Sequence, residues 1–266
     1  MSLYEIKKRL AVLEIFEKST YAMKIASSSL HIKMKKKCLY CEELKEKVST
    51  IQHLVLKKIN KEQKTRCLYI FIGSEKGFCG DYNTSMMKKF SEIYKENNAE
   101  PHLYLFIGRS LIKKIKTVSP HFFFFEQFRE KIFSVLQEKI KSIISDHSID
   151  LVKTIFHKSK SVGQKELAYS DYYPNSSTWE VNPVFKTGHF SHEEIKTQYL
   201  SIHYSYLFNY LFSMSFLTEQ GIRFVAMDTA LKNTKEAIDK NRKLYFKTRQ
   251  ENINKQLQDL TASLLI

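Results

Sequence analysis

A glycine-containing loop between a predicted strand and a predicted helix is the first candidate for binding chemistry in this chain. It reads Gly73-Ser-Glu-Lys-Gly-Phe-Cys-Gly80, and loops in this position bind phosphate groups in many α/β proteins. No G-K-[ST] follows the glycines, as a P-loop requires, and their spacing differs from G-x-G-x-x-G. Both mismatches argue against a nucleotide site, which we keep as an alternative interpretation of the loop.

Cysteine and histidine are the other residue types that could bind a metal or act in catalysis. Cys38 and Cys41 have the C-x-x-C spacing, but Cys67 and Cys79 do not form the second pair that a zinc site needs. A redox pair precedes a helix, whereas this pair lies inside a predicted one, so we predict structural packing. The nine histidines form no H-E-x-x-H motif. The spacing of the cysteines and histidines therefore indicates no metal ligand and no catalytic residue.

The net charge of the chain limits the classes of partner that it suits. The 266 residues carry a formal net charge of +15, which suits nucleic acid, an anionic membrane surface or an acidic protein surface. The basic cluster at Lys33 and 35–37 lacks the interleaved aromatic residues of a nucleic-acid site. A solvated helix face or an acidic protein partner is the favoured interpretation. The chain contains no apolar run long enough for a membrane span, and its four cysteines without a secretory signal favour a reducing compartment.

Turn-forming residues divide the chain into three predicted segments. All four prolines lie between residues 101 and 183, and six of the seven glycines lie between residues 73 and 188. Both ends are therefore nearly uninterrupted helix candidates. We predict an N-terminal helix over residues 1–58, a central α/β domain over 66–190 and a C-terminal helix over 192–266.

The N-terminal helix has the period of a coiled coil. Steps of four and three give a seam in which only Glu17 and Lys37 are charged. The C-terminal helix follows a similar pattern that fades after Tyr245, before an apolar tip at residues 253–264. We predict that the two helices pair antiparallel, with an amphipathic helix on a globular core as the alternative. The seam consists of Ile6, Leu10, Leu13, Glu17, Thr20, Met23, Ser27, Leu30, Met34, Lys37, Cys41, Leu44, Val48, Ile51 and Val55.

The central segment alternates short apolar runs with helix patterns. This alternation predicts a mainly parallel sheet covered on both faces, a Rossmann-like α/β domain. The pattern is weak from residue 158 to 189, where 179–183 is predicted as an extended segment. The predicted strands are 67–72, 103–107, 122–125 and 151–156, and the predicted helices are 82–97, 110–117 and 126–146.

Five segments together resemble the gamma subunit of the rotary ATP synthase. They are Leu3-Tyr-Glu-Ile-Lys-Lys-Arg-Leu10, Ser19-Thr-Tyr-Ala-Met-Lys-Ile-Ala26, Ser74-Glu-Lys-Gly-Phe-Cys-Gly-Asp-Tyr-Asn83, Arg223-Phe-Val-Ala-Met-Asp-Thr-Ala230 and Tyr245-Phe-Lys-Thr-Arg-Gln-Glu-Asn-Ile-Asn-Lys-Gln-Leu257. They occur in the order and spacing of the family, across most of the chain. Departures include Phe78 in place of leucine and Asp81 where glycine is frequent.

The resemblance implies a central-stalk rotor that couples proton-driven rotation of the ring of c subunits to conformational change at the catalytic sites of beta. The implied partners are three alpha and three beta subunits, the epsilon subunit and the c-ring, and not nucleic acid. Membrane association would occur only through the c-ring, on the cytoplasmic face of a bacterial inner membrane. Since the chemistry takes place in beta, the resemblance implies no cofactor and no catalytic residue here.

Particular residues follow from the same resemblance. Met23, Arg223, Arg249 and Gln250 are the implied contacts with beta and alpha. The signature loop is represented by Ser74, Gly77, Cys79, Gly80 and Asn83. The rival hypotheses are a coiled-coil adaptor or nucleic-acid-binding protein that uses the basic helices, and a flavodoxin-like or nucleotide-binding enzyme.

Overall fold

A computed structural model gives the fold of the chain and describes residues 2–58, 66–96, 102–116, 119–172, 179–181 and 191–264. The chain forms two compact units. One consists of residues 1–27 and 224–266, and the other of residues 28–223. Each terminal helix contributes a part to each unit.

The two long helices begin with the same capping arrangement. Helix α1 spans Leu3–Val55 and helix α5 spans His192–Leu264. Before α1, the N–H of Glu5 donates to the Ser2 hydroxyl (3.2 Å), and the N–H of Ser2 donates to the Glu5 carboxylate (2.8 Å). Ser191 and Glu194 repeat this capping box before α5. The boxes satisfy N–H groups that have no partner within the helix, and so they fix where each helix starts.

Helix α1 ends slightly earlier than the predicted segment 1–58. Residues Leu56–Lys58 form strand β1, which pairs antiparallel with β7 (Trp179–Val181). The described part of the extended segment predicted at 179–183 is therefore a strand. Residues 182–190 lie outside the described part of the chain.

In the unit that contains both termini, α1 and α5 lie side by side and antiparallel. Lys24 forms an ion pair with Asp228 (2.6 Å), and Arg242 forms one with Glu14 (3.1 Å). Between residues 6 and 27, every predicted seam position is buried or half-buried. On α5, the side chains on the buried or half-buried face recur in steps of four and three, and this face ends at Thr248. They are Met227, Leu231, Thr234, Ile238, Asn241, Tyr245 and Thr248.

The larger unit contains a five-stranded sheet of order β4-β3-β2-β5-β6. The first four strands are parallel to one another, and β6 runs antiparallel to β5. The prediction of a mainly parallel sheet is confirmed. The strands are β2 Cys67–Ile72, β3 Leu103–Ile107, β4 Phe122–Phe125, β5 Leu151–Ser161 and β6 Gln164–Tyr172.

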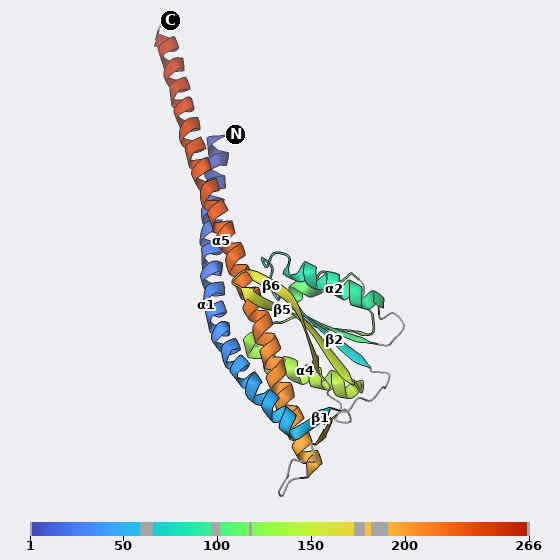
Figure 1. Ribbon diagram of the computed structural model, residues 1–266. Helices are drawn as coiled ribbons and strands as arrows, with labels where there is room; N and C mark the ends of the chain where they lie inside the picture. Colours follow the sequence, from blue (N-terminus) through green and yellow to red (C-terminus); the bar gives the residue numbers. More distant parts are fainter. Residues whose placement is uncertain are drawn as a thin grey trace. The chain divides into compact units, whose positions relative to one another are not determined.

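Helices cover both faces of this sheet, as predicted (Figure 1). Side chains alternate along β2, so that Ile70 packs on one face and Phe71 on the other. The Phe71 face packs against α2 (Tyr82–Glu96) and α3 (Arg109–Ile112). The Ile70 face packs against α4 (Phe133–Asp146) and the part of α5 in this unit. Both apolar faces of the sheet are thereby removed from water.

The long helices also pair within the larger unit. The Tyr206 hydroxyl donates to the Cys41 carbonyl oxygen (2.9 Å). His31 Nδ1 lies 3.1 Å from the Leu217 carbonyl oxygen. Cys38 and Cys41 are free, buried thiols, and Cys38 packs in the hydrophobic core beside Met34. Burial raises the pKa of Cys38 to about 12, with a further contribution from Cys41.

Two predicted elements have different bounds in the structure. The helix predicted from residue 126 begins at Phe133, after a 3-10 turn at Glu130–Ile132. Its start is delayed because Arg129 is extended (φ −138°, ψ 149°) and the N–H of Phe128 donates to the Glu75 carboxylate (2.9 Å). The helix predicted at 110–117 is the shorter α3.

The sheet also extends beyond its predicted part. Strand β5 continues five residues past the predicted end at 156, to Ser161. The chain then turns at Gly163 (φ 84°) into β6, which was not predicted. Strand β6 escaped prediction because most of its side chains are only half-buried, so it lacks a continuous apolar run.

Candidate functional site

The loop from Gly73 to Gly80 leaves β2 and enters α2 through a close approach to α3. A Cβ atom on Gly73 would lie 2.4 Å from the Leu111 Cβ and 3.0 Å from Asn83 Oδ1. Any side chain larger than glycine would therefore push α3 or the loop out of place. The first glycine of the loop serves packing in this structure.

Asn83 joins the two ends of the loop. Its Oδ1 accepts a hydrogen bond from the N–H of Ser74 (3.0 Å), and its Nδ2 donates to the Ser74 hydroxyl (2.7 Å). The same Nδ2 donates to the Ser110 hydroxyl (3.1 Å), which brings in α3. Asn83 and Ser74 are both buried, so these bonds replace water for groups that would otherwise be unpaired.

The second half of the loop has a left-handed backbone and a buried thiol. Phe78 (φ 60°) and Gly80 (φ 56°) lie on either side of Cys79. The Cys79 thiol donates toward the carbonyl oxygens of Lys76 (3.2 Å) and Gly77 (3.3 Å). Burial, together with the charge of Glu219, raises the pKa of this thiol. Cys79 is therefore a structural group in the loop and not an activated nucleophile.

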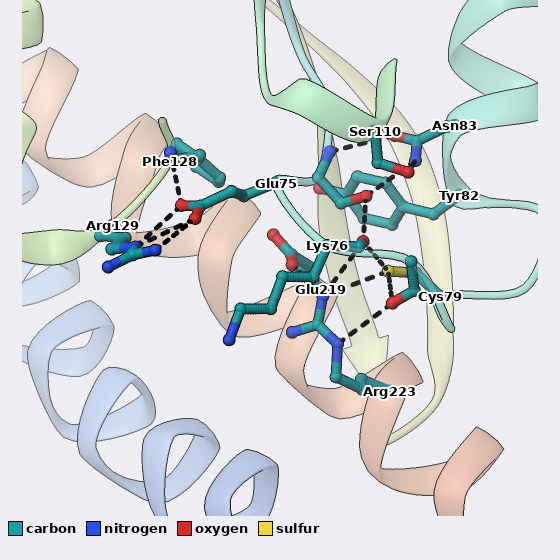
Figure 2. Close-up of polar contacts among 12 residues, drawn as sticks. Glu75, Lys76, Cys79, Tyr82, Asn83, Ser110, Phe128, Arg129, Glu219 and Arg223 are labelled. Carbon is teal, nitrogen blue, oxygen red and sulfur yellow. Dashed lines mark hydrogen bonds and ion pairs between the residues drawn. The ribbon is translucent and has the colours of Figure 1, made fainter. Parts of the chain in front are cut away.

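Arg223 of α5 binds this loop from the helix side (Figure 2). Its guanidinium donates to the carbonyl oxygens of Lys76 and Gly77, each at 3.4 Å, and to the Cys79 sulfur at 3.3 Å. The same guanidinium also donates to Oε1 of the Glu219 carboxyl group, one turn earlier on α5. Arg223 is 7% exposed and Glu219 is 1% exposed. The loop thus presents carbonyl groups to a cation, which is the opposite of what phosphate binding requires.

A second ion pair connects the other side of the loop to the segment before α4. The Glu75 carboxylate accepts hydrogen bonds from Arg129 Nη2 (2.7 Å) and from the N–H of Phe128 (2.9 Å) (Figure 2). Burial acts to raise the pKa of Glu75, but these two donors outweigh it and the pKa is lowered. Glu75 is therefore ionised at neutral pH.

The start of α2 is attached to α5 and to β5 by further hydrogen bonds. The Tyr82 hydroxyl lies 2.8 Å from the Ser215 hydroxyl. His157 Nε2 lies 3.0 Å from the Tyr82 carbonyl oxygen, and the Thr218 hydroxyl donates to the His157 carbonyl oxygen (3.0 Å). Burial lowers the pKa of His157 to about 4. Loop, strand and helix are thereby joined along α5 between Ser215 and Arg223.

The structure brings together only some of the residues implied by the resemblance. Ser74, Gly77, Cys79 and Asn83 lie in one network with Arg223, and Gly80 ends the loop. The other three implied contacts belong to the smaller unit: Met23 is half-buried, and Arg249 and Gln250 are exposed. Sequence reasoning missed Glu219, for which the i,i+4 spacing to Arg223 was the available signal.

Two further properties concern metals and membranes. Among the described residues, no three His, Cys, Asp or Glu side chains are arranged to hold a metal ion. Within the same part of the chain, no helix combines the length and apolar character needed to cross a lipid bilayer.

Two long terminal helices, with a mainly parallel α/β sheet between them in the sequence, define the class of protein, and comparison with known proteins agrees. The family model described as ATP synthase matches residues 2–264. The chain therefore belongs to the ATP synthase gamma family. It is 23% identical to the ATP synthase gamma chain of Rickettsia typhi over 282 residues, covering 98% of both chains. It is 25% identical to that of Helicobacter pylori over 305 residues, covering 99% of this chain and 98% of the relative.

Solved structures share the fold. The chain resembles a subunit of the Euglena gracilis mitochondrial ATP synthase in a structure of OSCP, F1 and the c-ring, with a TM-score of 0.71 and 14% identity. That match covers 99% of this chain and 93% of the other. The central stalk and c-ring structure of Tetrahymena thermophila gives a TM-score of 0.61 at 16% identity, covering 79% and 98%.

Proposed function

We propose that this chain is the central-stalk rotor of a proton-driven ATP synthase. In this role it transmits rotation of the c-ring to the catalytic sites of three beta subunits and so couples proton flow to ATP synthesis or hydrolysis. The observation that carries the proposal is the match of the gamma family over almost the whole chain. The solved assemblies of similar fold contain F1, a central stalk or a c-ring.

In this proposal the two helices form a left-handed antiparallel coiled coil. The 3.5-residue repeat of buried positions and the ion pairs Lys24–Asp228 and Glu14–Arg242 support it. The chain itself contributes no catalytic residue and binds no nucleotide. The support for this is the loop, whose carbonyl groups are used to bind Arg223.

The proposed partners are alpha, beta, epsilon and the c-ring, and the chain is held at the cytoplasmic face of the inner membrane through the c-ring. The bacterial relatives named above support this location. The surface of α5 beyond Thr248 supports contact with other subunits. There the apolar side chains of Ile253, Leu257 and Leu260 are 44%, 56% and 60% exposed, an arrangement that a protein partner would cover.

Within this surface, Arg249 and Gln250 are the proposed polar contacts with beta and alpha. On α1, the half-buried Met23 is the proposed apolar contact. Arg223 differs from them, because its guanidinium is held inside its own chain. A direct contact of Arg223 with beta would require it to leave the loop carbonyls. We therefore propose that the main role of Arg223 is to hold the loop in place within its own chain.

Purification of the chain from its own cells tests the proposal. We expect alpha and beta to be recovered together with epsilon, with three alpha and three beta subunits for each copy of this chain. Recovery of nucleic acid that is lost steeply with added salt would instead support the basic-adaptor alternative. Binding of ATP by the isolated chain at micromolar concentration would contradict the non-catalytic assignment.

A further inference from the structure

A stretch of α5 that is rich in polar residues is enclosed by the rest of the larger unit. Every residue from 211 to 223 is buried. A helix buried on all sides is normally apolar, but almost half of this stretch is polar. The buried polar side chains are Ser213, Ser215, Thr218, Glu219, Gln220 and Arg223. Groups of this kind are costly to bury unless each one has a partner.

Glu219 is the member of this stretch whose pairing is incomplete. One carboxylate oxygen, Oε1, pairs with Arg223. The other oxygen, Oε2, is buried and has no hydrogen-bond partner among the described residues. A bare oxygen of an ionised carboxylate in a protein interior is unfavourable, whereas a protonated carboxyl group lowers that cost.

The charged and titratable groups around Glu219 do not remove this cost. They are Arg223 on α5, Glu75, Lys76 and Cys79 on the loop, and Tyr82 on α2. Burial raises the pKa of Glu219 to about 7, and the charge of Glu75 adds to this. Arg223 and Lys76 act in the opposite direction. The loss of water thus outweighs the pairing with Arg223.

We propose that Glu219 is a positioning residue that holds Arg223 against the loop while carrying a proton, and that loss of this proton loosens the loop from α5. Figure 2 shows the arrangement on which this rests, with Glu219 and Arg223 on α5 facing Lys76 and Cys79 of the loop. The neutral carboxyl still accepts a hydrogen bond from the guanidinium through Oε1. The proposal concerns this chain alone and stands apart from the proposed rotor function.

The direction of the pH effect follows from linkage. With the loop closed, Glu219 takes up its proton at a higher pH than it does when exposed to water. Closure is therefore favoured by protons, and it weakens as the pH rises from that of an ordinary glutamate toward about 7. Above that pH both the closed and the open forms are ionised, and the dependence ends.

Hydrogen exchange of the full-length chain measures this directly. The readout is the protection of the backbone amides of residues 74–80, corrected for intrinsic exchange, in wild type and in Glu219→Gln. We expect the ratio of wild-type to variant protection to fall by up to about tenfold per pH unit between about pH 5 and 7, and then to level off. A ratio that does not change with pH would overturn the proposal.

A matched control removes the other carboxylate of the same loop. In Glu75→Gln, the loop loses its ion pair with Arg129 but keeps Glu219. Because the pKa of Glu75 is lowered, titration of Glu75 itself does not produce the pH dependence. The variant therefore keeps the pH dependence, which ends at a slightly lower pH because the charge of Glu75 no longer helps to raise the pKa of Glu219. Loss of the pH dependence in Glu75→Gln would contradict the assignment to Glu219.

A second measurement does not depend on how well the Glu219→Gln variant folds. Infrared spectra of the wild-type chain at pH 6 should contain the carbonyl band of a protonated carboxyl group, because ordinary carboxylates are ionised at that pH. Raising the pH to 8.5 should remove this band. Its absence at pH 6 would overturn the proposal.

Discussion

At the scale of single residues, buried polar contacts hold the loop from Gly73 to Gly80 against α5. Asn83 ties both ends of the loop together, and Arg223 binds its carbonyl oxygens from α5. Each contact places polar atoms where water cannot reach them, so each is costly to remove from one side only. Residues of the family signature are thus used, in this structure, to build a joint between a loop and a helix.

Gly73 and Gly77 offer a matched test of this joint. Gly73→Ala would place its Cβ 2.4 Å from the Leu111 Cβ, whereas nothing lies within 4 Å of a Cβ at Gly77. We expect Gly73→Ala to lower the free energy of unfolding by about 1–3 kcal/mol through overpacking, and Gly77→Ala to change it by less than about 0.5 kcal/mol. Urea unfolding of the isolated chain measures both. Equal effects of the two variants would contradict the close approach of the loop to α3.

His157 predicts a pH effect on stability whose sign is opposite to that of Glu219. Burial lowers the pKa of His157 to about 4, so below about pH 6.5 the unfolded chain binds a proton that the folded chain does not. Stability from His157 is present above that pH and is lost as the pH falls toward 4, by about 1.4 kcal/mol per unit.

The measurement is urea unfolding of wild type and His157→Gln between about pH 4 and 8. Relative to the variant, wild type should lose stability on the acid side. Glu219 opposes this trend in wild type, since its own contribution falls as the pH rises. A wild-type chain that gains stability toward pH 4, compared with His157→Gln, would show that the buried histidine is charged.

At the scale of elements, α5 has two parts with different surroundings. Residues 211–223 are buried on all sides, whereas residues 249–261 are exposed on all sides. Between them, one face of the helix contacts α1 in steps of four and three. A single helix therefore passes from a fully packed environment to one in which its side chains are available to other subunits.

Arg249 and Gln250 begin the exposed part of α5. Since both side chains are exposed, Gln250→Ala and Arg249→Ala should leave the unfolding of the isolated chain within about 0.5 kcal/mol of wild type. In the assembled complex, we expect each to lower ATPase turnover several-fold through lost contacts with beta or alpha. Lys139→Ala, which removes an exposed charge from α4, serves as the control. Unchanged turnover in both α5 variants would contradict the proposed contacts.

At the scale of the whole molecule, charge and apolar surface together indicate a protein partner. A net charge of +15 favours a partner with an acidic surface. The exposed apolar residues beyond Thr248 favour a partner whose contact removes them from water. Nucleic acid would satisfy the charge but not this apolar surface. The family to which the chain belongs provides such a partner.

Leu257 tests the apolar surface. In Leu257→Asp, a charge replaces a side chain that is 56% exposed in the isolated chain, so its folding should change little. Assembly with alpha and beta should become weaker by tenfold or more, on the order of 1.4 kcal/mol. Gln258→Asp adds the same charge one residue further on and is the control. Equal assembly of Leu257→Asp and wild type would show that this surface remains exposed to solvent in the complex.

The sequence alone determined the features that depend on local periodicity. The two long helices and the seam positions from Ile6 to Ser27 were predicted because burial of one face imposes a repeat on neighbouring residues. The four parallel strands were predicted because burial on both faces gives each a continuous apolar run. The five family motifs likewise needed only order and spacing. Strand β6 was missed for the same reason, since a half-buried edge strand has no continuous apolar run.

Only the tertiary structure decided which distant residues meet. The resemblance implies a contact of Arg223 with beta, and only the structure shows that loop atoms from Lys76 to Cys79 surround this side chain within its own chain. The only sequence signal for Glu219 is its i,i+4 spacing to Arg223, which many exposed pairs share, yet it is the buried carboxyl at the centre of the joint. Burial and the electrostatics that follow from it depend on contacts between residues more than a hundred positions apart, and these contacts exist only once the chain has folded.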